Sequence, residues 1–158
     1  MTGKGQDHPQ IHRMVHPPVL ALFYIIIAFL FGIIVPVLFV PTVLLRNIGF
    51  GLTIVGLLFG MSALIELRKA GTTLDPHGSA RKLVTSGIYR FSRNPIYLGY
   101  LLMVIGFPLI LGSYVGVLMM PIFALTMNRL VIEKEEAYLE SKFQGQYANY
   151  KSRVRRWL

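Results

Sequence analysis

Residues that could bind a charged ligand gather at positions 92–99, in the stretch SRNPIYLG. Pro is favoured at the first position of a helix and holds the residue before it extended, so we expect Asn94 to cap a helix that begins at Pro95. The unpaired N–H groups of that helix start, with Arg93 beside them, favour an anionic group. Tyr97 adds a ring that could contact a cation. A purely structural helix start would use the same residues, so this stretch alone does not distinguish a ligand site from a simple helix start.

Acidic residues form a second cluster, since four of the chain's seven carboxylates fall at positions 133–140. Pairing with nearby lysines on a solvated helix would account for them. Together with Arg129 and the predicted helix start, however, Glu133, Glu135 and Glu136 would provide charges of both signs for a zwitterion. The amino-acid end of S-adenosyl-L-methionine is such a group, and glutamates also suit its ribose hydroxyls.

The elements that must position these groups are apolar. Of the 158 residues, 54% are hydrophobic and 15% charged, whereas soluble domains are about 45–50% apolar. Charged residues are missing from positions 19–40, 47–65 and 95–128, which predicts membrane spans. The first apolar stretch is too long for a signal peptide core. The chain has no cysteine, which excludes disulfides and thiolate chemistry.

The spacing of the apolar stretches predicts four spans. Spans one and two cover roughly positions 19–35 and 48–67. The stretch 95–132 is about twice the ~20 residues of one crossing, and a turn at 111–114 (LGSY) divides it into spans three and four. We therefore predict an all-α fold, an integral membrane bundle of four transmembrane helices with a cytoplasmic C-terminal amphipathic helix.

We expect residues 1–158 to form a single membrane domain. Its predicted parts are a cytoplasmic tail (1–18), spans one and two (19–67), a cytoplasmic loop (68–94), the helical hairpin of spans three and four (95–132) and a C-terminal interfacial helix (133–158). The last part carries apolar residues at helical spacing, which predicts docking on the membrane surface. These residues are Leu139, Phe143, Tyr147, Tyr150 and Val154.

Basic residues are dense in alternate polar segments. Lys and Arg number two in the tail, one in the first connector, six at 68–93, none in the hairpin turn and seven from 129 onward. By the positive-inside rule both termini and the 68–94 loop lie in the cytoplasm, in a membrane of the bacterial inner (plasma) type. A net charge of +9 would favour nucleic acid in a soluble protein. Here it favours membrane lipids with anionic head groups, and we expect no nucleic-acid partner.

Two smaller patterns concern association and metals. Gly56 and Gly60 are spaced for close helix packing, which would also allow a homo-oligomer. His8, His12 and His16 are spaced as metal ligands on one helix face could be, but prolines interrupt that helix. We therefore expect no metal site.

A family resemblance appears in LVTSGIYRFSRNPIYLG (positions 83–99), followed after the hairpin by EEAYLESKF and YANYKSRV. These segments resemble the isoprenylcysteine carboxyl methyltransferase and phospholipid methyltransferase superfamily of integral membrane enzymes. The resemblance implies S-adenosyl-L-methionine as the cofactor, bound on the cytoplasmic side. It also implies methylation of a lipophilic small molecule or lipid substrate that enters from the bilayer.

The same resemblance implies the site residues. Tyr97 would line the pocket for the sulfonium, and Arg129 would orient an anionic group. An amine or thiol acceptor would need a proton acceptor, for which Glu133 or Glu136 is at hand, whereas a carboxylate acceptor would need none. The expected cofactor-binding residues are Gly71, Leu83, Gly87, Tyr89, Arg93, Asn94, Pro95, Tyr97, Leu98, Gly99, Glu135 and Glu136.

Two departures from the family pattern affect these expectations. Asn94 stands where the carboxyl methyltransferases have histidine, so a role that needs an imidazole is excluded. Gln144 occupies a position where the family has glycine, which bears on the local helix geometry. Two other functions fit the sequence: a membrane reductase that uses a nicotinamide cofactor, and a non-catalytic membrane protein that binds lipid or a partner.

Overall fold

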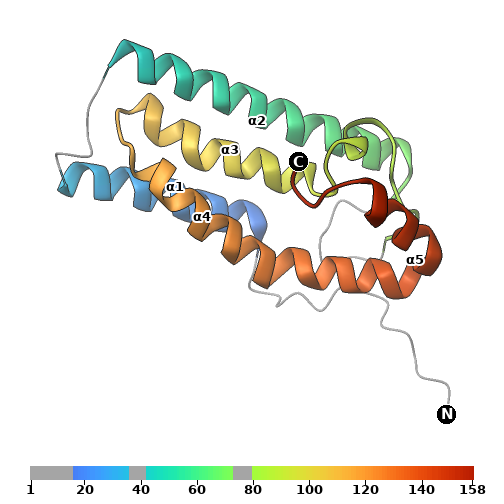
Figure 1. Cartoon of the computed structure of the whole chain (residues 1–158). Coiled ribbons are helices and arrows are strands. Elements are labelled where there is room, and N and C mark those ends of the chain that lie inside the picture. The colour runs from blue at the N-terminus through green and yellow to red at the C-terminus, as the bar shows by residue number, and fades with distance from the viewer. Residues whose placement is uncertain (1–15, 36–41, 73–79) are drawn as a thin grey trace.

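The computed structural model describes residues 16–35, 42–72 and 80–158, which form a helical bundle with no β-strand among them (Figure 1). The all-α class is therefore confirmed. The helices are α1 (Pro17–Ile34), α2 (Val43–Lys69), α3 (Pro95–Ile110), α4 (Val115–Met127) and α5 (Glu133–Arg153), with a short 3-10 helix η2 (Gly87–Arg90) and a π-helical turn η3 (Asn128–Ile132). Two of the three histidines considered above as metal ligands, His8 and His12, lie outside the described residues.

The apolar helices are those of an integral membrane protein. Among the described residues, three helical stretches are long and apolar enough to cross a bilayer: α1, α2 and the stretch that begins with α4. α3 is equally apolar but has only 16 residues, and at about 1.5 Å per residue it is shorter than the ~30 Å hydrocarbon core. Four crossings therefore stay a prediction.

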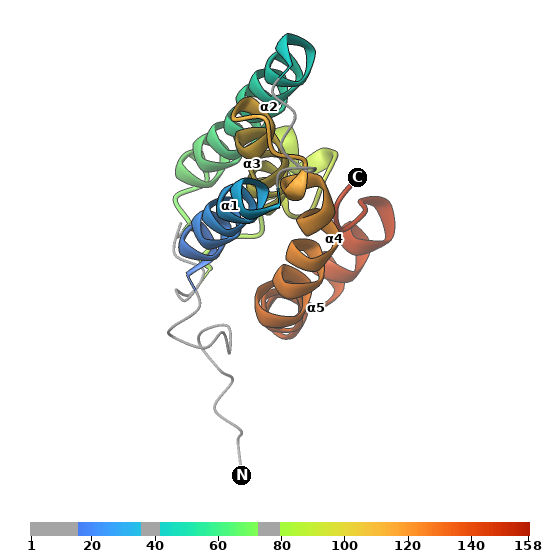
Figure 2. The same cartoon turned by 90° about the vertical axis from the view of Figure 1, so that its left-hand side faces the viewer.

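The predicted hairpin is confirmed: it consists of α3 and α4, and α3, its first helix, occupies the centre of the bundle. α3 packs against α1, α2 and α4, as the view down the bundle shows (Figure 2). At the turn, Gly112 has a φ of 90°. The hydroxyl of Ser113 donates to the carbonyl of Ala28 at 2.9 Å, which ties the turn to α1. This bond fixes the end of α3 that lies away from Pro95.

α2 and α3 pack closely because both carry glycine at the contact. A Cβ added at Gly56 would lie 2.7 Å from the carbonyl oxygen of Gly99, and one added at Gly99 would lie 2.5 Å from that of Gly56. An added Cβ at Gly60 would meet open space. Of the predicted pair, only Gly56 is therefore required at a helix contact.

α2 is longer at both ends than the predicted second span. It begins earlier because Thr42 caps it, accepting a hydrogen bond from Leu45 N–H at 3.3 Å. It ends where Gly71, at a φ of +64°, and Thr72 donate to carbonyls of the last turn at 3.0 and 3.2 Å. This is the Schellman arrangement, in which glycine provides the left-handed residue.

One end of the bundle collects the polar segments. This end, called the basic end below, comprises the start of α1, the end of α2, residues 80–94, the start of α3 and α5 (Figure 1). Apart from Arg46 and Arg129, the Lys and Arg residues of the described ranges lie in these segments or in residues 154–158, which follow α5. The distribution is that of the positive-inside rule, and the assignment of this end to the cytoplasm stays a prediction.

α5 continues from α4 through the π-helical turn. The whole stretch, Val115–Arg153, has 39 residues. At about 1.5 Å per residue this is roughly twice the thickness of a ~30 Å bilayer core, so part of it must lie outside the membrane. Its charged residues begin at Arg129, and α5 starts with Glu133. We therefore expect α5 to lie outside the hydrocarbon core, and this position stays a prediction.

The apolar stripe of α5 does not all face the membrane surface. The helix bends at Gln144, whose φ of 43° and ψ of −119° are not helical. Beyond the bend Tyr147 and Tyr150 turn inward, with 1% and 8% of their surface exposed. The interfacial orientation predicted for these two tyrosines is wrong, because the bend redirects the stripe toward the protein. The glycine expected at the bend would adopt this backbone without strain.

Replacing Gln144 with glycine should stabilise the protein. A non-glycine residue in a sparsely populated φ/ψ region costs of order 1–3 kcal/mol, which exceeds the roughly 0.5–1 kcal/mol entropic cost of glycine. We expect Gln144→Gly to raise the thermal unfolding midpoint in detergent. Gln146→Gly, the same exchange at an exposed and regularly helical position, should lower it, by about 1 kcal/mol in stability. Equal losses in the two variants would contradict the backbone geometry at Gln144.

Candidate functional site

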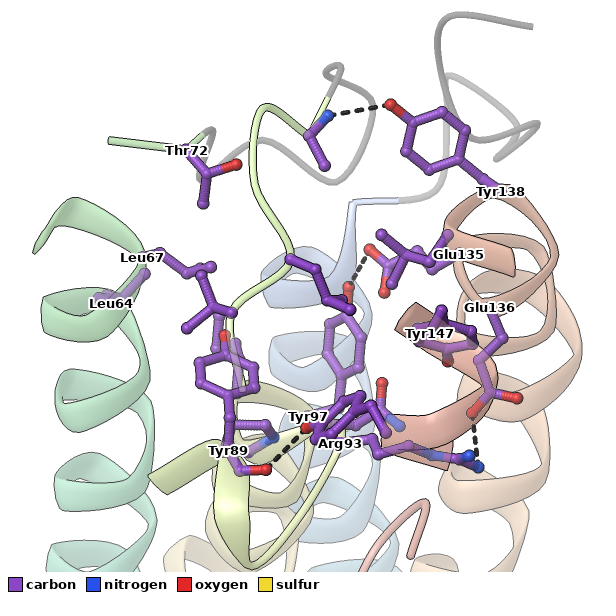
Figure 3. Close-up of a pocket in the computed structure, with 18 of the residues that line it drawn as sticks. Leu64, Leu67, Thr72, Tyr89, Arg93, Tyr97, Glu135, Glu136, Tyr138 and Tyr147 are labelled. Carbon is purple, nitrogen blue, oxygen red and sulfur yellow. Dashed lines mark hydrogen bonds and ion pairs between the residues drawn. The ribbon is translucent and has the colours of Figure 1, made fainter. Parts of the chain in front are cut away.

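A cavity of about 250 Å³ lies at the basic end, lined by α1, α2, Thr72, residues 80–93, the start of α3 and α5 (Figure 3). Six of the chain's eight tyrosines line it: Tyr89, Tyr97, Tyr100, Tyr138, Tyr147 and Tyr150. Apolar side chains from α1 and α2 complete the wall, including Pro17, Leu64 and Leu67. Two segments far apart in sequence, the start of α3 and the start of α5, therefore meet at one cavity.

The first direct link between the two segments is a hydrogen bond. Tyr97, in the first turn of α3, donates its hydroxyl proton to Oε1 of Glu135 at 2.7 Å. Figure 3 shows this pair at the centre of the lining residues. The Tyr97 ring lies at 6.4 Å from that of Tyr100, centroid to centroid. An acceptor carboxylate and two aromatic faces are thus placed side by side.

The second link is an ion cluster around Glu136. Its Oε1 lies 3.0 Å from Nη2 of Arg93, and its Oε2 lies 2.7 Å from Nη2 of Arg156. The side chains of Arg93 and Glu136 are only 9% and 8% exposed. Nε of Arg93 is buried without a hydrogen-bond partner in the described part of the chain. A guanidinium donor therefore remains at the cavity wall for an anionic group.

Asn94 does not act as the sequence predicts. It precedes α3, but its side chain makes no capping hydrogen bond to the helix. Instead its Nδ2 donates to the carbonyl of Arg156 at 2.9 Å, and its own N–H donates to the hydroxyl of Ser92 at 3.1 Å. The capping prediction is wrong because a carbonyl from the end of the chain competes for the amide. The free N–H groups of the helix start stay available to a ligand.

The loop between α2 and α3 is anchored across the cavity. Thr72 accepts a hydrogen bond from Arg81 N–H at 2.9 Å, and the hydroxyl of Tyr138 accepts one from Ala80 N–H at 3.0 Å. The hydroxyl of Tyr150 donates to the carbonyl of Tyr89 at 2.7 Å. α5 therefore forms one wall of the site and also holds the loop that faces it.

The structure brings eight of the predicted cofactor-binding residues to the cavity wall. They are Leu83, Tyr89, Arg93, Asn94, Pro95, Tyr97, Glu135 and Glu136. The other four, Gly71, Leu98, Gly99 and Gly87, do not line it. Gly71 ends α2, and Gly99 contacts Gly56. Gly87 has a φ of +57° and lies against Glu66, where a Cβ would come within 2.7 Å of the carboxyl carbon. Leu98 is buried within the bundle, 4% exposed.

Only one of the three predicted catalytic residues lines the cavity. Tyr97 lines the cavity, but Arg129 and Glu133 do not. These two face each other at 3.9 Å, one turn apart, with side chains 70% and 43% exposed. They lie on a different face of the helix from Glu135, which leaves Glu135 as the glutamate that contacts Tyr97.

Arg156, which pairs with Glu136 beside the cavity, and three of the cavity tyrosines were not predicted as site residues. Arg156 sits within a run of basic residues, which resembles a membrane-surface cluster. Tyr147 and Tyr150 were assigned to the membrane surface because a helical period does not distinguish lipid from protein as the apolar neighbour. Tyr138 lies between the stripe positions. The position at which the family has glycine, Gln144, is a sequence signal for the bend that turns the two tyrosines inward.

Burial governs the protonation of the polar groups at the wall. It raises the pKa of Glu135 to about 7, the hydrogen bond from Tyr97 acts in the opposite direction, and the charge of Glu136 adds to the rise. Burial also raises the pKa of Tyr89, Tyr147 and Tyr150. These phenols therefore stay neutral near pH 7, while Glu135 exchanges a proton there.

Comparison with known proteins gives the family. The sequence profile described as phospholipid methyltransferase matches residues 45–146. Protein-S-isoprenylcysteine O-methyltransferase B of Arabidopsis thaliana is 30% identical over 118 residues, which cover 70% of this chain and 57% of that protein. The protein-S-isoprenylcysteine O-methyltransferase of Schizosaccharomyces pombe is 36% identical over 72 residues, which cover 46% of this chain and 30% of that protein.

An uncharacterized protein of Haemophilus influenzae is 46% identical over 63 residues, its full length and 40% of this chain. The match spans less than two thirds of each of the two methyltransferases. The family profile, however, covers more than half of this chain, and it includes the start of α3 together with Glu135 and Glu136. The chain therefore belongs to the phospholipid methyltransferase family.

Proposed function

We propose that the protein transfers a methyl group from S-adenosyl-L-methionine to a lipophilic or lipid-linked acceptor at the cytoplasmic membrane face. The observation that carries the proposal is the single cavity at which Arg93 and Tyr97 meet Glu135 and Glu136. Family membership and the names of the two methyltransferase relatives support it.

The residues at the wall fit the charges of S-adenosyl-L-methionine. Tyrosine rings attract a cation held over their faces, which suits a sulfonium, and the Glu135 carboxylate suits an amino group or hydroxyls. The unpartnered Nε of Arg93 and the N–H groups at the start of α3 suit a carboxylate. When bound, S-adenosyl-L-methionine supplies an electrophilic methyl group on a sulfonium.

The chain's own contribution to such a reaction would be to align the acceptor, to exclude water and to take up a proton. Six tyrosines and apolar residues of α1 and α2 line the cavity, and with a ligand bound they would limit the access of water and restrict the approach of an acceptor. Glu135 is the wall carboxylate suited to take the proton of an amine or thiol, because its pKa of about 7 matches a general base near neutral pH. A carboxylate acceptor would leave Glu135 with a binding role only.

The same wall supports a lipophilic acceptor. Pro17, Leu64 and Leu67 belong to helices whose outer faces are apolar. An acceptor with a long apolar group could therefore reach the cavity without leaving the membrane. The basic end supplies charges for the anionic head groups of neighbouring lipids.

Cofactor binding should depend on Glu135. We expect the purified protein to bind S-adenosyl-L-methionine in a calorimetric titration, and Glu135→Gln to weaken the affinity roughly tenfold, as expected for the loss of a charge-assisted contact. Glu140→Gln removes the same charge from an exposed position on α5 whose partner is Lys151, and should leave the affinity unchanged. The proposal fails if the unmodified protein shows no binding at millimolar cofactor, or if it binds a reduced nicotinamide dinucleotide instead.

Affinity should also depend on pH through Glu135. Below pH 7 this carboxyl is protonated in the folded protein, and above pH 7 it is ionised, so attraction for a cation grows as the pH rises. We predict that affinity increases between pH 6 and 8, with a midpoint near 7. The cofactor titrates as well, so the quantity to compare is the difference between the unmodified protein and Glu135→Gln. A difference that stays constant across this range would remove Glu135 from the binding equilibrium.

The acceptor class is open to a direct test. Membranes that contain the protein should transfer label from methyl-labelled S-adenosyl-L-methionine into a product that partitions into organic solvent, and mass spectrometry should identify the methylated atom. Membranes with Tyr97→Ala should lose most of this transfer. Label found only in water-soluble products would contradict a lipophilic acceptor.

A further inference from the structure

The last five residues of the chain, 154–158, close over the start of α3. α5 ends at Arg153, and Val154 is extended, with a φ of −121° and a ψ of 131°. The N–H of Arg93 then donates to the carbonyl of Arg155 at 3.0 Å, and Nδ2 of Asn94 donates to the carbonyl of Arg156 at 2.9 Å. We call residues 154–158 the C-terminal latch.

Side chains of the latch reach further into the protein. Nε and Nη2 of Arg156 donate to the two oxygens of Glu136 at 3.2 and 2.7 Å, a bidentate pairing. Trp157 packs against the buried cluster that contains Tyr97. The latch therefore contacts both segments that meet at the cavity, the start of α3 and the start of α5.

The pairing with Arg156 determines what Glu136 can do. Oε1 of Glu136 is shared between Arg93 and Arg156, and Oε2 is bonded to Arg156. Both oxygens are therefore engaged within the protein, and Figure 3 shows the Glu136 carboxylate turned toward Arg93, while that of the adjacent Glu135 is bonded to Tyr97. The paired glutamates make different contacts: Glu135 lines the cavity beside Tyr97, and Glu136 joins α5 to Arg93 and to the latch.

Loss of the Arg156 side chain would disturb the site in two ways. Glu136 would keep only Arg93 as a charged partner, and the Arg93 guanidinium would be free to turn toward it and away from the cavity. The carbonyl that holds Asn94 would also lose its anchor. Bidentate charge-assisted contacts are stronger and more directional than neutral ones, so their loss moves buried partners.

We propose that Arg156 is a positioning residue of the ligand site, acting through Glu136 and Asn94, and that the C-terminal latch is an integral part of this site. The latch lies beyond the residues matched by the family profile, which end at position 146. The affinity test below uses S-adenosyl-L-methionine and therefore rests on the proposed function. The contacts of the latch do not depend on that function.

The first test observes the latch without any ligand. The chain has no cysteine, so Arg155→Cys provides a unique site for a nitroxide label at an exposed side chain. We expect a slow label in the otherwise unmodified protein and a mobile label when Arg156→Ala is added. Arg153→Ala, which removes the same charge from an exposed position at the end of α5, should leave the label slow. Equal label mobility in the Arg156 and Arg153 variants would overturn the latch.

The second test measures positioning. Binding of S-adenosyl-L-methionine should weaken roughly tenfold in Arg156→Ala, and Arg156→Lys, which keeps the charge but not the bidentate geometry, should weaken it less. Arg153→Ala should bind as the unmodified protein does. If the unmodified protein binds no cofactor, the proposed function fails, and the spin-label result still decides the latch. If the unmodified protein does bind the cofactor, a mobile label together with unchanged cofactor affinity in Arg156→Ala would overturn the role of Arg156 in positioning.

Discussion

A buried carboxylate between two guanidinium groups organises the basic end of this protein. Glu136 is 6% exposed and lies against Arg93 and Arg156. An unpaired buried charge costs several kcal/mol, so α5 can pack here only where both arginines reach it. That requirement brings together the start of α3, the start of α5 and the end of the chain. Because Glu135 is the preceding residue on the helix, the same contact directs it toward Tyr97.

Two irregularities in the last helical stretch make this contact possible. The π-helical turn at Asn128–Ile132 inserts an extra residue into one turn and changes the face that α5 presents to the bundle, a feature often found at functional sites. The bend at Gln144 then returns the chain, so that Tyr147 and Tyr150 cover the cavity. A straight helix of this length would carry both tyrosines away from the site. The strain at Gln144 accompanies a geometry that the site needs.

Much of this arrangement could be predicted from the sequence, and the remainder depends on tertiary contacts. Helical periods, the turn at Gly112 and the Pro95 helix start are local signals, and each is found where the sequence placed it. The pairing of the α3 start with the paired glutamates followed from their charges. Asn94 was misassigned because a carbonyl distant in sequence competes for its amide. Arg156 was missed since a basic residue near a membrane has a simpler explanation, and only packing shows its partner.

The central claim is that Tyr97 and Glu135, from two separate helices, act on one bound ligand. A double-mutant cycle on the dissociation constant of S-adenosyl-L-methionine tests it most directly, with Tyr97→Phe, Glu135→Gln and the combined variant. Since the two side chains share a hydrogen bond of 2.7 Å, we predict strong coupling, so that the combined variant binds little worse than the weaker single variant. Losses in binding free energy that simply add would contradict a shared site.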